Sequence, residues 1–327
     1  MTEESILSQR GPAWRRLEEL TAKAGHSFKR LHDDELEEFV RLYRQTSADL
    51  AFLMTRSSND AVVEYLNAIV GRAYSQLYRE PYKPWAKRFQ DSLYAAADTV
   101  RRRHKAVFLA IGIFFAAMVT TSGLLSYSDD FRQFYIPQDP AMRQNFEKWK
   151  SGEFDPRTEG ESSLATFFYA SNNPRVSIVV HAISVLSFGT YSSYLIWQNG
   201  SLLGALGHEM AGVGKLGYLV VSIVPHGVTE IGGIFMSGAG AFVLAWALIF
   251  PGRRTRAEAL RIAGKDAFVL VMLSVVMTLM AAPIEGFFSF DPRIPAPFKA
   301  LVGVVTLGGW IAFFAGYGRS RQEALVE

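Results

Sequence analysis

Apolar runs as long as a lipid bilayer is thick fill the chain from Ala106 onward. A helix needs about 20 mostly apolar residues to cross roughly 30 Å of hydrocarbon. The segments that meet this requirement comprise residues 106–127, 176–197, a less regular stretch within 202–224, 226–250, 267–288 and 298–317. We therefore predict an all-α fold, a polytopic membrane protein with about six transmembrane helices.

The residues before the first of these segments are dense in charge and have the periodicity of amphipathic helices. Four helical patterns follow one another there, enough to bury a modest core as a small bundle. The N-terminus carries Glu3 and Glu4 but no apolar run, so it lacks the features of a signal peptide. We expect a cytoplasmic helical domain over residues 1–105 and a transmembrane domain over residues 106–327.

The composition excludes several classes of protein. The chain has no cysteine, so it has no disulfide, no thiolate nucleophile and no cysteine-ligated zinc. Its formal net charge is only +3, and the basic residues are spread among acidic ones instead of forming one stripe. No nucleic-acid partner is therefore expected. The partner that the apolar segments require is membrane lipid.

The distribution of lysine and arginine orients the segments, because short cytoplasmic loops carry an excess of these residues. Basic clusters precede the first segment (101–105), separate the fourth from the fifth (253–265) and follow the sixth (Arg319 and Arg321). All three clusters are cytoplasmic if the number of crossings is even. The connection over residues 128–175, with six basic and eight acidic residues, then lies outside, where it has room to contact a partner or a second copy of the chain.

Four of the ionisable residues within the apolar segments stand out, because a charge there costs roughly 2.5–3.5 kcal/mol at the bilayer centre. His226 and Glu230 begin the fourth segment four residues apart, so they share one helix face. Glu285 is near the end of the fifth segment, and His181 is near the start of the second. Alternating segment directions bring all four to the outer half of the bilayer, which predicts a polar intramembrane site.

Two interpretations of this site are open. As a metal site, imidazoles and carboxylates suit a divalent cation such as zinc, with His226, Glu230 and Glu285 as ligands. As a packing network, the same groups hydrogen-bond the helices to one another. Zinc hydrolases usually have a second histidine four residues after the first, and Glu230 occupies that position here. The packing network is therefore favoured.

Two further predictions are based on the positions of small residues. Gly233 and Ser237 are one turn apart, a spacing that lets helix backbones approach closely, so we expect them at a helix contact. The glycines over residues 200–217 indicate a broken or re-entrant third segment, which is a feature of transporters. His208 and Glu209, in the same segment, are expected on the inner side, facing water.

Several short motifs together resemble the stage II sporulation protein M family of bacterial multi-pass membrane proteins. In the membrane part the motifs are Asn199-Gly200 with Leu203-Gly204, Pro225-His226-Gly227 with Glu230, Pro251-Gly252, and Ala281-Ala282 with Ile284-Glu285. Ahead of it they are Gln9-Arg10 with Trp14 and Leu17-Glu18-Glu19-Leu20, Leu42-Tyr43-Arg44 with Ser47-Ala48-Asp49-Leu50, and Tyr65-Leu66-Asn67. At the position of His181, many members of that family have asparagine.

The resemblance implies an integral protein of the bacterial inner membrane without an established enzymatic activity. The namesake holds peptidoglycan-remodelling proteins of the cell envelope in a membrane complex. Longer members with a cytoplasmic domain tend to be encoded beside MoxR-type AAA+ ATPases and von Willebrand A-domain proteins. We therefore expect a homo-oligomeric scaffold that organises such partners at the membrane. The alternative is an intramembrane metal-dependent enzyme or small-solute transporter that uses the histidine and glutamate site.

Overall fold

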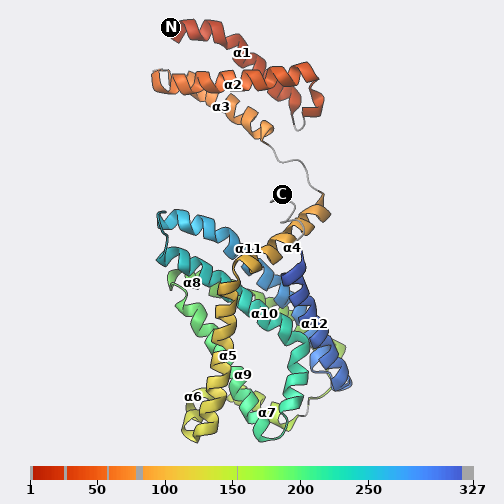
Figure 1. Ribbon diagram of the computed structural model, residues 1–327. Helices are drawn as coiled ribbons and strands as arrows, with labels where there is room; N and C mark the ends of the chain where they lie inside the picture. The colour runs from red at the N-terminus through yellow and green to blue at the C-terminus, as the bar shows by residue number, and fades with distance from the viewer. Residues whose placement is uncertain (1–2, 26–27, 57–58, 79–83, 153, 319–327) are drawn as a thin grey trace. The chain divides into compact units, whose positions relative to one another are not determined.

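The computed structural model describes residues 3–25, 28–56, 59–78, 84–152 and 154–318. Helices make up nearly all of this part of the chain, and it contains no β-strand (Figure 1). The all-α prediction is therefore confirmed. The chain divides into two compact units, residues 1–84 and 85–327.

The first unit packs three long helices around one apolar core. They are α1 (Glu3–Ala24), α2 (Asp33–Arg56) and α3 (Asp60–Leu77), with a short 3-10 turn, η1 (Phe28–Arg30), between the first two. Their buried side chains recur three or four residues apart, as in helices that face a core. The buried residues include Trp14, Leu17, Leu20, Phe39, Leu42, Leu66, Ile69 and Ala73. At the edge of this core, the indole N–H of Trp14 donates a 2.9 Å hydrogen bond to Asp49.

The second unit contains the remaining helices. The long ones are α5 (His104–Tyr127), α8 (Glu159–Leu186), α9 (Thr190–Gly212), α10 (Leu216–Ile249), α11 (Arg256–Pro283) and α12 (Ala296–Gly316). The shorter ones are α4 (Trp85–Arg102), η2 (Asp129–Phe131), α6 (Arg132–Tyr135), α7 (Pro140–Ser151) and η3 (Ile284–Ser289), a π-helix that continues α11. In the described part of the chain, four helices are long and apolar enough to cross a membrane: α5, α10, α11 together with η3, and α12.

The fourth helix of the predicted N-terminal bundle belongs to the second unit instead. α4 packs on α11 and α12, and its Ala96 and Val100 join the apolar core of that unit. The expected bundle is therefore wrong in its fourth helix, and the observed boundary falls between Pro84 and Trp85 and not after residue 105. Amphipathicity shows that a helix has an apolar face, but it does not show which surface that face covers.

α5 and α9 run side by side in the same direction. Gly200 lies against the carbonyl of Phe114, and Gly204 lies against the backbone of Met118, so both helices advance by four residues between the two contacts. A Cβ atom at either glycine would collide with the α5 backbone. The predicted third segment, residues 202–224, is indeed broken between α9 and α10, but α9 itself is continuous, and two of its glycines allow close helix packing.

Two of the predicted segments are divided differently in the structure. Residues 176–197 contain the turn between α8 and α9, where Phe188 and Gly189 have φ values of 51° and 83°. Residues 202–224 contain the turn between α9 and α10, where Gly214 has a φ of 70°. Each turn changes the conformation of only a few residues inside a long apolar run, so hydropathy does not reveal it.

α10 contacts most of the other long helices. The Ser237 hydroxyl on α10 donates a 2.9 Å hydrogen bond to the carbonyl of Ser177 on α8. Gly233 lies against Thr278 of α11, where a larger residue would press on that side chain. Gly233 and Ser237 are thus both buried at helix contacts.

The two ends of the long helices carry different short elements (Figure 1). α4 precedes α5 at one end, which we call the α4 end. There Arg102 and Arg103 pair with Asp266 of α11 at 3.1 and 2.7 Å. α6 and α7 follow α5 at the opposite end, which we call the α7 end.

Glu209 lies near the end of α9, at the α7 end. Its carboxylate pairs with Arg132 of α6 at 2.7 Å and with Lys150 of α7 at 3.5 Å, and its side chain is buried. The neighbouring His208 lies 3.3 Å from the hydroxyl of Ser126 on α5. The prediction that Glu209 faces water on the side of the basic cluster at 101–105 is therefore wrong, because sequence alone did not show that α9 ends beside α6 and α7.

Candidate functional site

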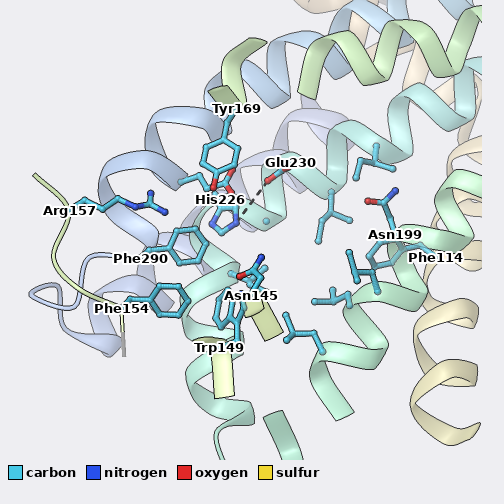
Figure 2. Close-up of a pocket in the computed structure, with 18 residues that line it drawn as sticks. Phe114, Asn145, Trp149, Phe154, Arg157, Tyr169, Asn199, His226, Glu230 and Phe290 are labelled. Atoms are coloured by element: carbon cyan, nitrogen blue, oxygen red, sulfur yellow. Dashed lines mark ion pairs between the residues drawn. The ribbon is translucent and has the colours of Figure 1, made fainter. Parts of the chain in front are cut away.

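His226, Glu230 and Glu285 meet inside the second unit. Figure 2 shows the first two beside each other, joined by a dashed line. One ligand atom from each lies within 4.8 Å of the other two. His226 and Glu230 stand one turn apart on α10, and Glu285 comes from η3. His226 and Glu285 are buried, with 5% and 8% of their surface exposed. π-Helical turns such as η3 are rare and are frequently found at functional sites.

His226 is held through one ring nitrogen and one ring face. Its Nδ1 atom lies 2.7 Å from the hydroxyl of Ser289, and its ring centroid lies 5.4 Å from that of Phe290. The Nε2 atom points toward the Glu230 carboxylate, 4.0 Å away. Metal-binding histidines are usually fixed by a hydrogen bond through their second nitrogen. Nε2 is therefore the nitrogen that this arrangement leaves for a cation.

Glu230 is anchored by a neutral group from a third helix. The side-chain amide of Asn173 on α8 donates a 2.8 Å hydrogen bond to Oε1 of Glu230. The other oxygen, Oε2, faces His226. An amide donor fixes the position of a carboxylate without balancing its charge.

Glu285 has a buried carboxylate oxygen, Oε2, that finds no hydrogen-bond partner among the described residues. Tyr169 and Arg157 interact with the same carboxylate. The Arg157 guanidinium is shared with other groups, because it also donates to the carbonyl of Gly286 at 3.3 Å and lies over the ring of Phe290 at 5.4 Å.

These contacts bear on the two interpretations of the site. A buried polar network stabilises helix packing only when its members are satisfied, since an unpaired polar atom loses its hydration without compensation. Here Glu230 and Glu285 bring two carboxylates together, and one oxygen remains without a hydrogen bond. The geometry suits a cation held among three ligands better than a closed packing network.

A cavity of about 360 Å³ adjoins the three residues (Figure 2). Its wall combines the cluster with aromatic and polar side chains, including Trp149, Phe154, Phe290, Tyr169, Arg157, Asn145 and Asn199. Small-molecule sites in proteins usually have volumes of about 300–1,000 Å³. The cavity can therefore hold several waters or a small ligand next to the cluster.

His181 is not among the residues that the structure shows in this cluster. Its backbone lies in α8, but its side chain is outside the described residues. It follows Asn173 by eight residues, which is a rise of about 12 Å along a helix. The α8 side chain that reaches Glu230 is that of Asn173.

Sequence reasoning missed the residues around the cluster, which are Asn173, Ser289, Arg157 and Tyr169. Asn173 lies within the connection predicted over residues 128–175, in an Asn-Asn-Pro sequence that is typical of loops. In the structure, α8 already begins at Glu159, with a capping box between Thr158 and Glu161. A Thr-x-x-Glu pattern marks such a helix start and is readable from sequence.

Two protein families match the chain, one in each unit. The family described as stage II sporulation protein M matches residues 105–290, more than half of the chain. The chain belongs to this family. The stage II sporulation protein M match contains all three residues of the cluster and ends just after η3. A domain of unknown function (DUF8413) matches residues 5–79, within the first unit. No curated protein and no solved structure matches the chain.

Proposed function

We propose that this membrane protein binds a divalent cation through His226, Glu230 and Glu285 in the outer half of the bacterial inner membrane. The observation that carries the proposal is the unpartnered Oε2 of Glu285, which is buried beside a second carboxylate and an imidazole nitrogen. Two carboxylates in surroundings of low polarity repel each other unless one of them is protonated or a cation balances them. A divalent cation supplies that charge.

The ligand chemistry supports zinc or a similar ion. One imidazole nitrogen and two carboxylate oxygens belong to the donor types that zinc binds. Structural zinc sites are closed by four protein ligands, whereas sites with three protein ligands keep a position for water or substrate. The adjoining cavity supports the second kind. Such a site serves either a metal-dependent enzyme or a protein that carries the cation itself.

We infer six crossings, with both termini in the cytoplasm. α8 and α9 are less apolar than the four helices named above, but they are packed within the same layer. α9 runs parallel to α5. α8 and α12 run parallel to α10 and antiparallel to α11, so the six long helices alternate in direction along the chain. The basic clusters at 101–105 and 253–265 then lie together at the α4 end, which the positive-inside rule makes cytoplasmic. The α7 end is therefore outside.

Metal content tests the proposed site. The full-length chain, purified in detergent, stripped with a chelator and reloaded with Zn²⁺, should hold stoichiometric zinc by elemental analysis. Glu230→Gln and Glu285→Gln should hold much less, because each replacement keeps the side-chain shape and removes a ligand charge.

Glu209→Gln is the matched control, because Glu209 is also a buried glutamate of a long helix but pairs with Arg132 and Lys150. It should retain zinc. The proposal is wrong if the wild-type chain binds no divalent cation, or if the variants at Glu230 and Glu285 retain as much as the Glu209 variant.

A second candidate function is that of a scaffold, and the separate first unit favours it. α1, α2 and α3 close an apolar core of their own. An exposed aromatic pair marks the C-terminal end of α3: Tyr74 in its last turn and Tyr78 just after it, with ring centroids 4.6 Å apart. Exposed aromatic side chains are enriched at protein interfaces. We propose that this unit recruits cytoplasmic partners to a homo-oligomer, with MoxR-type AAA+ ATPases and von Willebrand A-domain proteins as the first candidates.

Affinity purification from native membranes tests the scaffold. The tagged full-length chain should co-purify with an ATPase or A-domain protein, and a chain that lacks residues 1–84 should lose that partner. Tyr74→Ala combined with Tyr78→Ala should weaken recovery if the aromatic pair is the contact. The same partners with and without residues 1–84 would contradict the docking role of the first unit.

A further inference from the structure

Two further cavities adjoin the one beside the cluster, and each shares part of its wall. Toward the α7 end, a cavity of about 350 Å³ shares Phe154, Arg157 and Phe290 with it. Toward the α4 end, a cavity of about 190 Å³ shares Asn199 and Glu230 with it. We call the three the outer, central and inner cavities. They form a row in which Glu230 borders both the central and the inner one.

The inner cavity has a polar wall although it lies among apolar helices. Side chains from α8, α9, α10 and α11 contribute to it, and the polar ones include Asn173, Ser177, Ser192, Asn199, Ser237 and Thr278. Of the described residues in this wall, none is a lysine or arginine. Polar residues inside a membrane layer are expensive and mark ion or substrate pathways. Carboxylate, amide and hydroxyl oxygens are ligands for cations.

Ser192 gives independent evidence that the inner cavity binds a polar ligand or ion. Its side chain is fully buried, and its Oγ has no hydrogen-bond partner among the described residues. A serine in a helix can donate its hydroxyl to a carbonyl one turn earlier, as Ser177 does to Asn173 at 3.1 Å. The Ser192 hydroxyl lines the cavity without such a bond.

The inner cavity reaches far toward the α4 end. Gly238, which lines it, lies next to Ala110 of α5. Ala110 is four residues after Ala106, where the apolar run of α5 begins, and four residues of helix rise about 6 Å. Beyond this level the core consists of apolar side chains such as Val243 and Leu270. The row of cavities therefore extends from the α7 end through most of the helix layer and is closed at the α4 end.

We propose that the three cavities form one water-accessible pathway, by which a divalent cation passes from the outside to Glu230 and on to Ser192 in the inner half of the membrane. This inference rests on the proposed cation site and adds a route to it. The cation first passes the charged side chains of the outer cavity, among them Asp155 and Arg157. It then meets the carboxylates of Glu230 and Glu285, and after them the neutral oxygens of the inner cavity. The structure corresponds to a state that is open to the outside and closed to the cytoplasm.

Single cysteines test the pathway, because the chain has none of its own. Intact cells that express Ser192→Cys or Thr278→Cys are treated from outside with a small cationic methanethiosulfonate that does not cross membranes. The thiol that remains after detergent extraction is measured with a maleimide that shifts the band on a gel. Both variants should be modified at least tenfold faster than the controls.

The controls lie on helices that contribute to the inner cavity, but their own side chains do not line it. Ser184→Cys replaces a buried serine of α8 that lines none of the three cavities. Val276→Cys lies on α11, two residues before Thr278, and faces the outer surface of the unit, with 50% of its side chain exposed. Zn²⁺ added outside should slow modification of Ser192→Cys several-fold, and Glu230→Gln should abolish this protection.

The outcomes separate the pathway from the cation site. Equal modification rates at the lining and control cysteines would overturn the pathway. Stoichiometric zinc in the purified protein would then still support the cation site. Rapid modification of Ser192→Cys without protection by Zn²⁺ overturns passage of the cation by this route. In that case, the zinc content of the purified protein alone tests the proposed cation site.

Discussion

The Nδ1 atom of His226 lies 2.7 Å from the hydroxyl oxygen of Ser289, and this contact joins the middle of α10 to the last residue of η3. Because the contact occupies one nitrogen of the imidazole, it directs the other, Nε2, toward Glu230. Ser289 is fully buried, so bulk water does not compete for its hydroxyl. Ser289 is thus a positioning residue for the histidine of the cation site.

Removing the Ser289 hydroxyl should weaken zinc binding without removing a ligand. Ser289→Ala is expected to lower zinc affinity by about 10–100-fold, the usual effect of losing the group that orients a metal-binding histidine. Competition with a chromogenic chelator measures this. Ser274→Ala is the control, because it deletes another buried hydroxyl, one that donates to Ser177 at 3.1 Å. Equal losses in both variants would show that Ser289 acts only on stability.

The close packing of α5 on α9 should make two glycines intolerant of any side chain. Gly200→Ala and Gly204→Ala each place a Cβ against the α5 backbone and should destabilise the protein by about 1–3 kcal/mol, the usual range for overpacking. Thermal unfolding in detergent measures the effect. Gly207→Ala is the control, since nothing lies within 4 Å of its Cβ position. A stable Gly200 variant would contradict the observed α5 and α9 pairing.

The ion pair of Glu209 should contribute more to folding stability than a surface salt bridge does. Arg132→Ala leaves the buried Glu209 carboxylate with only the longer contact to Lys150, and should cost about 2 kcal/mol. This is below the roughly 3–5 kcal/mol typical of a fully buried pair, because Arg132 is partly exposed. The double variant with Glu209→Gln should recover part of the loss. An additive double-variant cycle would show that the two side chains do not interact.

The meeting of His226, Glu230 and Glu285 followed from the sequence because ionisable residues in apolar segments are few and alternating helix directions set their depth. The partner of Glu230 on α8 did not follow. The sequence around Asn173 is typical of a loop, and only the full course of α8 shows that it is helical. The α8 residue expected at the depth of Glu230 therefore depends on which part of α8 crosses the membrane.

Glycine shows a second limit of sequence reasoning. A cluster of glycines is consistent with a broken helix or with a close helix contact, and both readings use the same lack of a Cβ. Gly200 and Gly204 serve the close contact, whereas Gly214 forms a turn. Which role a glycine has depends on what lies opposite it in the fold. For Gly200 and Gly204, the opposite residues on α5 are about 86 positions away in the chain.

The turn between α8 and α9 distinguishes six crossings from four. With six crossings, Phe188 in this turn lies in the cytoplasm. If only the four most apolar helices crossed, α8 and α9 would both remain outside, and Phe188 with them. Its side chain is 54% exposed, so a cysteine there is open to reagents. Phe188→Cys should therefore escape an impermeant maleimide in intact cells and react after permeabilisation.

Two further single cysteines calibrate that measurement. Asp130→Cys lies in η2 at the α7 end and should react in intact cells, whereas Arg254→Cys lies in the exposed turn before α11 and should react only after permeabilisation. Labelling of Phe188→Cys in intact cells would overturn the crossings of α8 and α9 but keep the orientation of the other four helices. Labelling of Arg254→Cys in intact cells would reverse the orientation, and the cation site would then open toward the cytoplasm.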